Sequence, residues 1–351
     1  MSLFKGKNLS VEILGESHAE QMQLKVKGFK KFTFDSDELL TFTSRRKASN
    51  SNFSTSRIEQ DLPIFENVIN NTVDDEFNVI IKNNNVKSGD YKNLYGKPRP
   101  SHADYAWYLK DGALDFSGGG RFSARLTAPY CVLGGICKQY LESLGVKVVA
   151  YLQSVGSVSG GSYRDKELTY QTVVDKTQGF PSLDKKEQML LEIENAKKNG
   201  DSVGGVVEVI VYGMPSCVGD NLFEGLEGKI SSLLFSIPAV KGVEFGLGFD
   251  MAKSYGSKVN DELYYDENGA IRIKTNNNGG INGGISNGFN ITMRVAVKPT
   301  PSISKTQNTI DIVNKKNCEI KIKGRHDACV AVRAVPCIES AVMLAICDEI
   351  M

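Results

Sequence analysis

Two long apolar segments decide the fold, and the clearer of them is PCIESAVMLAICDEI at residues 336–350. Its apolar side chains would cover most faces of a helix. The same is true of ARLTAPYCVLGGICKQYLESL at residues 124–144, which is rich in small residues. A helix that is apolar on most faces must be covered on more than one side. Both segments are therefore predicted to be buried helices.

In the segments around these two helices, apolar and polar residues alternate with the period of β-strands. Asn268-Gly269 lies between two short runs, residues 263–265 and 271–273, and predicts a hairpin because Asn-Gly accepts positive φ. The strands are therefore expected to be antiparallel. The predicted strands are residues 23–29, 77–82, 146–158, 205–212, 271–274, 289–297 and 319–323.

Antiparallel strands with helices buried among them predict an α+β fold. We expect a layered β-α-β sandwich, with the helices enclosed between antiparallel sheets. Residues 184–199 carry one apolar stripe between Asp184-x-x-Glu187, which resembles a capping box, and Gly200, so they predict an amphipathic surface helix. No linker or repeat divides the chain, and residues 1–351 are interpreted as a single domain.

The composition excludes several classes of protein. The chain has 41% hydrophobic and 24% charged residues and a net charge of +1, so it lacks the positive field of nucleic-acid binders. It has no signal-peptide core and no apolar run near the roughly 20 residues of a membrane span. We expect a cytoplasmic protein with no nucleic-acid or membrane partner. The seven cysteines contain no C-x-x-C pair and are interpreted as buried reduced thiols.

Only three histidines occur in the 351 residues, and each has carboxylates or arginines as close neighbours in the chain. They are His18 in GESHA, His102 in RPSHADY and His326 in GRHDA. Imidazole titrates near neutral pH, so this pattern favours proton chemistry on an anionic substrate. A capped loop or a satisfied core imidazole would explain any one histidine alone. Three imidazoles can also hold zinc, but Arg325 would oppose a cation and no ligand spacing is present, so no metal is expected.

Two glycine-rich segments are candidate binding loops. Residues 117–120 precede Arg121 and Arg125, and exposed backbone N–H groups, a helix start and two guanidinium groups favour an anion site. A flexible turn with solvated arginines is the alternative. Residues 276–288 would allow close approach of a flat ring, and Lys298 beyond them would contact a phosphate or a reduced ring. No Walker or Rossmann motif is present.

Taken together, these clusters resemble the chorismate synthase family from about residue 11 to the C-terminus. The motifs that carry the resemblance, in chain order, are GESHA (15–19), RPSHADY (99–105), GGGRFSAR (118–125), IPAVKGVEFGLGFD (237–250), NNNGGINGGISNG (276–288), KPTPS (298–302) and GRHDACVAVRAVPCIES (324–340).

The resemblance implies a carbon-oxygen lyase of the shikimate pathway, which leads to the aromatic amino acids. Such enzymes convert 5-enolpyruvylshikimate 3-phosphate to chorismate and phosphate by a 1,4-anti elimination. They need reduced FMN although the reaction has no net redox change, and the flavin is thought to lend an electron transiently. NADPH is the expected reductant, used by the protein itself or by a separate flavin reductase. The family also implies a homotetramer with helices sandwiched between sheets.

The resemblance also implies roles for individual residues. His102 matches the histidine that protonates reduced flavin, and His18 matches the one that protonates the departing phosphate. Asp327 matches the aspartate that, with the flavin N5, relays the proton from substrate C6, supported by Ser17 and Ser123. The expected flavin contacts are Arg121, Phe122, Ser123, Pro238, Ala239, Gly283, Lys298, Pro299, Thr300, Pro301, Ser302 and Arg325. The expected substrate-binding residues are Arg46, Arg99 and Arg125.

The chain departs from the family pattern at several positions. Phe122 and Leu126 replace a usual serine and glutamate, Leu114 lies among altered residues before the glycines, and Asn52 replaces a common substrate arginine. Losing one charge-assisted contact costs about 1.5 to 3 kcal/mol. We therefore expect substrate binding to be roughly 10- to 150-fold weaker than in a motif-complete relative.

Three alternatives stay open from the sequence. Arg45, Lys47 or Arg57 would compensate for Asn52 if one of them reached the substrate. A divergent member of the family would bind flavin with weak or no turnover. A metal-dependent hydrolase would instead bind zinc and lose activity to chelators.

Overall fold

Two antiparallel five-stranded sheets enclose a layer of helices. The computed structural model describes residues 2–16, 19–47, 60–83, 94–116, 119–162, 168–322 and 327–351. The first sheet has the order β1 (Ser2–Lys5), β2 (Ser10–Leu14), β3 (Gln21–Thr33), β5 (Thr72–Lys82) and β4 (Pro63–Glu66). The second has the order β7 (Val158–Ser159), β6 (Lys147–Val155), β8 (Gly205–Tyr212), β14 (Ile291–Val297) and β9 (Val240–Phe245).

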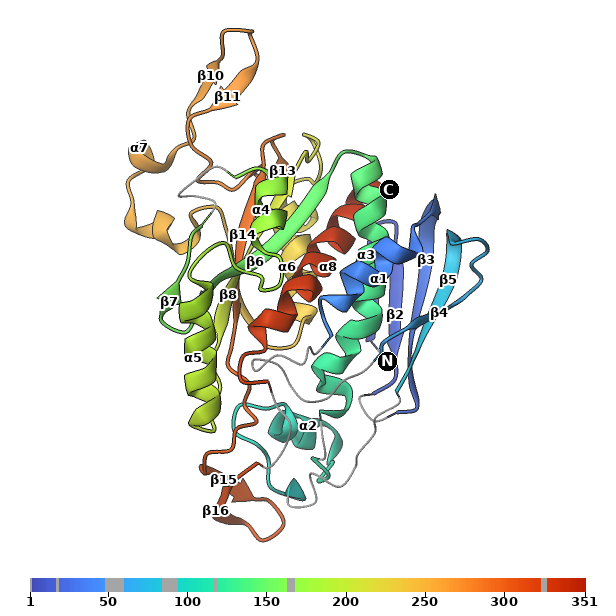
Figure 1. The fold of residues 1–351 in the computed structure, drawn as a ribbon, viewed down its shortest axis with the longest axis vertical. Coiled ribbons are helices and arrows are strands. Elements are labelled where there is room, and N and C mark those ends of the chain that lie inside the picture. Colours follow the sequence, from blue (N-terminus) through green and yellow to red (C-terminus); the bar gives the residue numbers. More distant parts are fainter. Residues whose placement is uncertain are drawn as a thin grey trace.

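The helix layer is built on α3 (Thr127–Ser143) and α8 (Ala331–Ile350), which lie between the sheets in Figure 1. Helix α8 packs on β6 and β8, while α3 packs on β3 and β5. Two further helices flank them, α1 (Ser36–Ser44) beside α3 and α6 (Leu226–Ser236) beside α8. The structure therefore confirms the predicted α+β sandwich with two buried helices.

Glycine lets α3 and α8 approach closely. A Cβ on Gly134 would lie 2.1 Å from the Ser340 Oγ atom of α8, and one on Gly135 would lie 2.5 Å from a methyl group of Leu39 in α1. Neither position tolerates a side chain without moving its neighbour. Both helices begin at the same end of the layer, because Cys131 faces Cys337 while Cys137 faces Cys347 further along.

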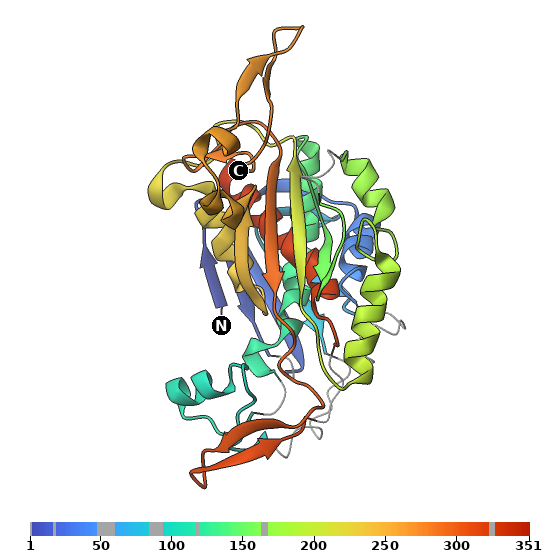
Figure 2. The ribbon, with the colours of Figure 1, turned by 90° about the vertical axis from the view of Figure 1, so that its left-hand side faces the viewer.

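A partial outer layer covers the second sheet. Helices α4 (Tyr170–Lys176) and α5 (Lys186–Lys198) pack against β6, and Figure 2 shows both along one side of the molecule. Val173 of α4 forms a small apolar cluster with Val149, Tyr151 and Ile210 of the sheet. The amphipathic surface helix expected at residues 184–199 is α5.

The two ends of the molecule differ in Figure 1. One end carries α2 (Asp104–Asp111) and the hairpin of β15 (Gln307–Asp311) and β16 (Lys316–Ile320). The other carries the projecting hairpin of β10 (Leu263–Tyr265) and β11 (Ile271–Ile273), as Asn268-Gly269 predicted. The remaining short elements are 3-10 helices Gly120–Phe122, Ala124–Leu126, Leu222–Glu224 and Gly248–Lys253, helix α7 (Gly256–Val259), and strands β12 (Ile281–Asn282) and β13 (Ile285–Ser286).

Several local expectations are wrong. Asp184 does not cap α5, because its carboxylate accepts from the Gly161 N–H at 2.9 Å and the cap position is Lys185. The strand predicted at residues 319–323 begins and ends three residues earlier, at Lys316–Ile320. Cys217 is exposed and Cys318 half-buried, whereas the other five cysteines are buried free thiols. Among the described residues, no helix combines the length and apolarity needed to cross a membrane.

Candidate active site

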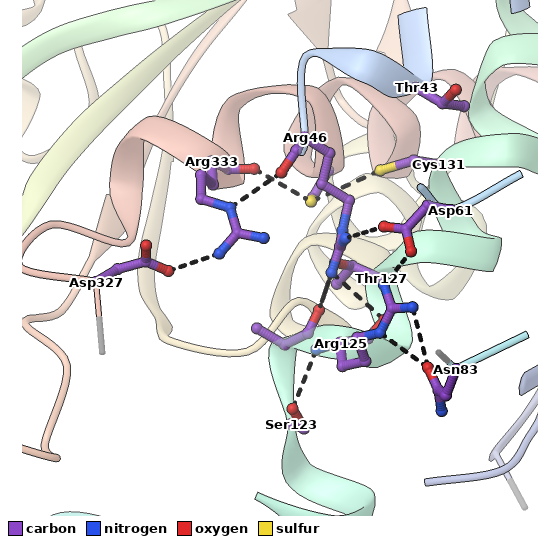
Figure 3. A network of polar contacts seen from close by, with 12 residues as sticks. Thr43, Arg46, Asp61, Asn83, Ser123, Arg125, Thr127, Cys131, Asp327 and Arg333 are labelled. Atoms are coloured by element: carbon purple, nitrogen blue, oxygen red, sulfur yellow. Dashed lines mark hydrogen bonds and ion pairs between the residues drawn. The ribbon is translucent and has the colours of Figure 1, made fainter. Parts of the chain in front are cut away.

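One part of the candidate site lies where α3 and α8 begin, as Figure 3 shows. Arg46 follows α1, Ser123 and Arg125 precede α3, and Asp327 precedes α8. Of the other expected residues, Ser17, His18, Arg325, Asn52, Arg57 and the neighbouring His326 lie outside the described residues.

Arg46, Asp61 and Arg125 form a buried group that we call the arginine cluster. Their side chains are only 5%, 8% and 7% exposed. Asp61 accepts from Arg46 Nη1 at 3.2 Å through one oxygen and from Arg125 Nη1 through the other. Arg46 Nε also donates to Thr127 Oγ1 at 2.8 Å, and both Nε and Nη2 of Arg125 donate to Asn83 Oδ1. Two guanidinium groups share one carboxylate, and guanidinium groups held in this way suit the binding of an anion.

Arg333 connects Asp327 to the arginine cluster. Its Nη1 donates to Asp327 Oδ2 at 2.8 Å, and its Nε donates to the Arg46 carbonyl oxygen at 3.0 Å. The sequence pattern does not predict Arg333 as a site residue, because Pro336 indicates the start of the last helix. The helix begins at Ala331 and contains Pro336 within it, so its first turn carries Arg333. The available signal was the arginine six residues after Asp327.

Arg99, His102 and Asp104 form a second group, the histidine cluster, at the start of α2. The Asp104 carboxylate accepts from Arg99 Nε at 2.7 Å, Arg99 Nη2 at 2.8 Å and the Arg99 backbone N–H at 3.0 Å. His102 Nδ1 lies 2.5 Å from Asp104 Oδ1. Burial raises the pKa of Asp104, but hydrogen bonds from Arg99 and His102 outweigh it and lower this pKa to about 2. The carboxyl group is therefore ionised at neutral pH.

A series of hydrogen bonds links the histidine cluster to the residues just before α8. Arg99 Nη1 donates to Ser302 Oγ at 3.4 Å, and Ser202 Oγ donates to the Thr300 carbonyl oxygen at 2.7 Å. The next residue, Val203, donates its N–H to the Ala328 carbonyl oxygen at 2.8 Å, beside Asp327. The segment after β14 therefore lies between the start of α8 and the histidine cluster.

The segment at residues 298–302 contains two polar groups of interest. Lys298 Nζ donates to the Ser101 carbonyl oxygen at 2.6 Å. Burial, followed by the nearby charge of Lys241, lowers the pKa of Lys298 below its ordinary value. Thr300 Oγ1 is buried and has no hydrogen-bond partner among the described residues. A buried hydroxyl without a hydrogen-bond partner is energetically costly, so this atom is a candidate contact for a bound molecule.

Arg121 and Phe122 share one aromatic neighbour, the only tryptophan of the chain. The Arg121 guanidinium lies 4.6 Å from the Trp107 ring centre, a cation-π contact, and Phe122 meets the same ring edge-on at 5.4 Å. Phe122 is still 41% exposed. Trp107 was not among the expected site residues, although its position three residues after Asp104 on a helix was a usable signal.

The expected flavin contacts do not all lie together. Pro238 and Ala239 precede β9, and the Ala239 carbonyl oxygen accepts from the Lys298 N–H at 2.9 Å, so they adjoin the segment at residues 298–302. Gly283 lies instead in the turn between β12 and β13, before the start of β14. The seven residues of β14 then span about 23 Å to Lys298. In Figure 1, β13 is accordingly near the end of the molecule opposite α2.

Arg45 is engaged elsewhere. Its Nη1 and Nη2 donate to the two oxygens of the buried Glu339 at 2.6 and 3.2 Å. Glu339 also accepts from the Ala150 N–H at 2.6 Å. Burial opposes the charge of Arg45, but the Glu339 carboxylate outweighs it and raises the pKa of Arg45. This pairing makes Arg45 a poor replacement for the arginine that is missing at Asn52.

Fold and site together define a class: a layered α+β protein with buried arginine–aspartate pairs before its central helices and an imidazole held by a buried carboxylate. Comparison with known sequences makes the assignment specific, because a family model described as chorismate synthase matches residues 9–351. The chain belongs to the chorismate synthase family.

Similar proteins agree with this assignment. The chain is 38% identical over 351 residues to a chorismate synthase of Pyrococcus abyssi, covering 99% of this chain and 97% of that one. It is 39% identical to a chorismate synthase of Korarchaeum cryptofilum and 37% identical to one of Dehalococcoides mccartyi. Each of these two matches covers 99% of this chain and 96% of the relative. A crystal structure of chorismate synthase matches the fold with a TM-score of 0.76 at 24% identity, covering 98% of this chain and 92% of that one.

Proposed function

We propose that this protein converts 5-enolpyruvylshikimate 3-phosphate to chorismate and phosphate in a reduced-FMN-dependent 1,4-anti elimination. The observation that carries the proposal is the arginine cluster, joined through Arg333 to Asp327 at the start of two buried helices. A substrate with two carboxylates and a phosphate needs several fixed cations. A carboxylate such as Asp327 beside them suits removal of a carbon-bound proton.

Substrate binding is assigned to Arg46, Arg99 and Arg125. All three are almost fully buried, so their charges are poorly screened by water and their geometry is fixed by hydrogen bonds. Each pairs with an aspartate, and in the arginine cluster two guanidinium groups share one carboxylate. Fixed guanidinium groups bind carboxylate and phosphate with little loss of conformational freedom.

The residues after β14 fit the flavin. The partnerless hydroxyl of Thr300 and the ammonium group of Lys298 suit the polar atoms of FMN, and Arg121 with Phe122 offers a flat, partly exposed face. Ser123, Pro238, Ala239, Pro299, Pro301, Ser302 and Arg325 are assigned to the same cofactor. Reduced FMN, when bound, supplies an electron transiently to the ring that loses phosphate.

The protein's own residues handle the protons. His18 gives a proton to the departing phosphate oxygen as the C–O bond breaks, and Asp327 takes the proton that leaves C6 as the second double bond forms. Arg333 orients Asp327 for that transfer through its 2.8 Å hydrogen bond. His102 holds a proton close to the flavin. Ser17 and Ser123 support Asp327, and Ser123 Oγ accepts from the Arg125 N–H at 3.2 Å.

The functional unit is proposed to be a cytoplasmic homotetramer. Gly283 lies too far from Lys298 to contact the same flavin, so we assign its flavin contact to another copy of the chain. Large apolar side chains that are more than four-fifths exposed, at Leu222, Phe223 and Tyr255, favour burial between copies. Sedimentation should give four times the chain mass, and a monomer would contradict the assembly.

Anaerobic turnover tests the proposed function. With chemically reduced FMN and 5-enolpyruvylshikimate 3-phosphate, we expect chorismate and phosphate in equal amounts.

A matched reaction with NADPH and oxidised FMN identifies the source of reduced flavin. Turnover in both reactions means that the protein reduces the flavin itself, whereas turnover with chemically reduced FMN alone means that a separate reductase does so. Flavin binding without phosphate release would favour the divergent family member instead. Quenching of the Trp107 fluorescence by FMN measures that binding independently of turnover.

A further inference from the structure

The His102 imidazole is held through only one of its two nitrogens. Nδ1 lies 2.5 Å from Asp104 Oδ1 and 3.1 Å from Arg99 Nη2. Every interaction that the structure gives this ring among the described residues is at Nδ1. The side chain is 16% exposed, so the ring is neither sealed in the core nor free in solvent.

The contacts determine which nitrogen carries the proton. The ionised Asp104 carboxylate has no hydrogen to donate, and a lone pair on Nδ1 at 2.5 Å would repel it. The two hydrogens of Arg99 Nη2 have other acceptors, Asp104 Oδ1 at 2.8 Å and the Phe116 carbonyl oxygen at 3.3 Å. Both hydrogens of Arg99 Nη2 can therefore be donated without using Nδ1 of His102 as an acceptor. The proton belongs on Nδ1, where it is donated to Asp104.

The loop that carries the ring is held in place around the same carboxylate. Asp104 accepts the Arg99 backbone N–H at 3.0 Å, and the His102 N–H donates to the Arg99 carbonyl oxygen at 3.2 Å. Ser101 adopts a positive φ of 59°, a conformation uncommon for residues other than glycine, and its carbonyl oxygen accepts from Lys298. The position of the ring is thus determined by contacts from α2 and from the segment after β14.

We propose that Asp104 is a positioning residue that fixes His102 in the Nδ1–H tautomer, so that Nε2 is the only atom through which this ring exchanges a proton. The assignment deepens the proposed function, because the proton on His102 then lies on a defined side of the ring. The charged groups that face the ring or its loop among the described residues are Arg99, Asp104 and Lys298. Of these, only Asp104 accepts a hydrogen bond from it.

The scarcity of histidine makes the proposal testable by NMR. In protein labelled with ¹⁵N only at histidine, three imidazoles contribute signals, and a His102→Gln variant identifies those of His102. In the neutral form of the ring we expect a protonated Nδ1 and an unprotonated Nε2. A protonated Nε2 with an unprotonated Nδ1 in the wild-type protein would overturn the proposal, without any need for a variant to fold.

Asp104→Ala tests the cause of the tautomer. Without the acceptor, the Nε2–H form that histidine prefers in water should appear, and kcat in the anaerobic assay should fall about 10- to 100-fold. Asp111→Ala, which removes a carboxylate from the other end of α2, should change neither the tautomer nor kcat. An unchanged tautomer in folded Asp104→Ala would refute the role of Asp104. If the wild-type protein lacks turnover but holds the Nδ1–H form, the proposed function fails while the tautomer assignment stands.

Discussion

The arginine cluster and the histidine cluster use the same pairing for different purposes. In each, a buried aspartate binds a buried arginine, at 3.2 Å for Arg46 and Asp61 and at 2.7 Å for Arg99 and Asp104. The second partner differs: Asp61 also binds a guanidinium, whereas Asp104 also binds an imidazole. Guanidinium stays charged at all relevant pH values, but imidazole does not. The two clusters therefore differ in the group that shares the carboxylate, which is a second guanidinium in the first and an imidazole in the second.

The largest effect is expected when the shared carboxylate of the arginine cluster is removed. Asp61→Ala leaves two buried guanidinium groups without their counter-ion, and losing one partner of a buried pair costs about 3 to 5 kcal/mol. We expect a decrease of that size in the free energy of unfolding measured with urea. Asp111→Ala is the control and should have little effect. A loss below about 1 kcal/mol for Asp61→Ala would mean that the two arginines do not depend on Asp61.

A second prediction concerns the binding role of the arginine cluster. Arg125→Lys keeps the charge but loses the contacts that Nε and Nη2 make with Asn83. We expect substrate affinity to fall roughly 10- to 150-fold, equivalent to about 1.5 to 3 kcal/mol. Isothermal titration of the substrate with the flavin-loaded protein measures this directly. Unchanged affinity would assign anion binding to other residues.

The histidine cluster predicts a pH dependence of stability. The pKa of Asp104 is lowered from 3.8 to about 2 in the folded protein, so its contribution is fully present above pH 3.8 and is lost as the pH falls towards 2. The contribution is about 2 kcal/mol. In urea unfolding, wild type should therefore exceed Asp104→Asn in stability by more at pH 5 than at pH 2.5. A difference that stays constant over this range would contradict the depressed pKa.

The smallest effect is expected for a residue outside both clusters. Phe122→Ser restores the residue that the family pattern has at this position and removes one edge-on contact with Trp107. Such aromatic pairs contribute about 0.5 to 1.5 kcal/mol. We expect a stability loss in that range and altered Trp107 emission, with substrate affinity unchanged. A large loss of substrate affinity would extend the binding site to this aromatic face.

Elements with a long and regular local pattern could be predicted from the sequence. The strand at residues 205–212 and the buried helix that contains residues 336–350 are long and strongly patterned, and both are present. The sequence did not predict the partners that tertiary structure brings together. Asp61 is 15 residues from Arg46 and 64 from Arg125, so no spacing rule connects them. Arg333 was missed because Pro336 suggested a helix start, whereas the helix begins five residues earlier.

The most direct test of the division of labour between the clusters is His102→Gln, studied anaerobically with reduced FMN. Substrate affinity and single-turnover rate are measured on the same preparation. We predict substrate affinity within about threefold of wild type. The single-turnover rate should fall about 100-fold or more, because proton transfer by a positioned side chain contributes about 100- to 10,000-fold. Weaker binding with an unchanged rate would contradict this prediction, since His102 would then belong to the anion site.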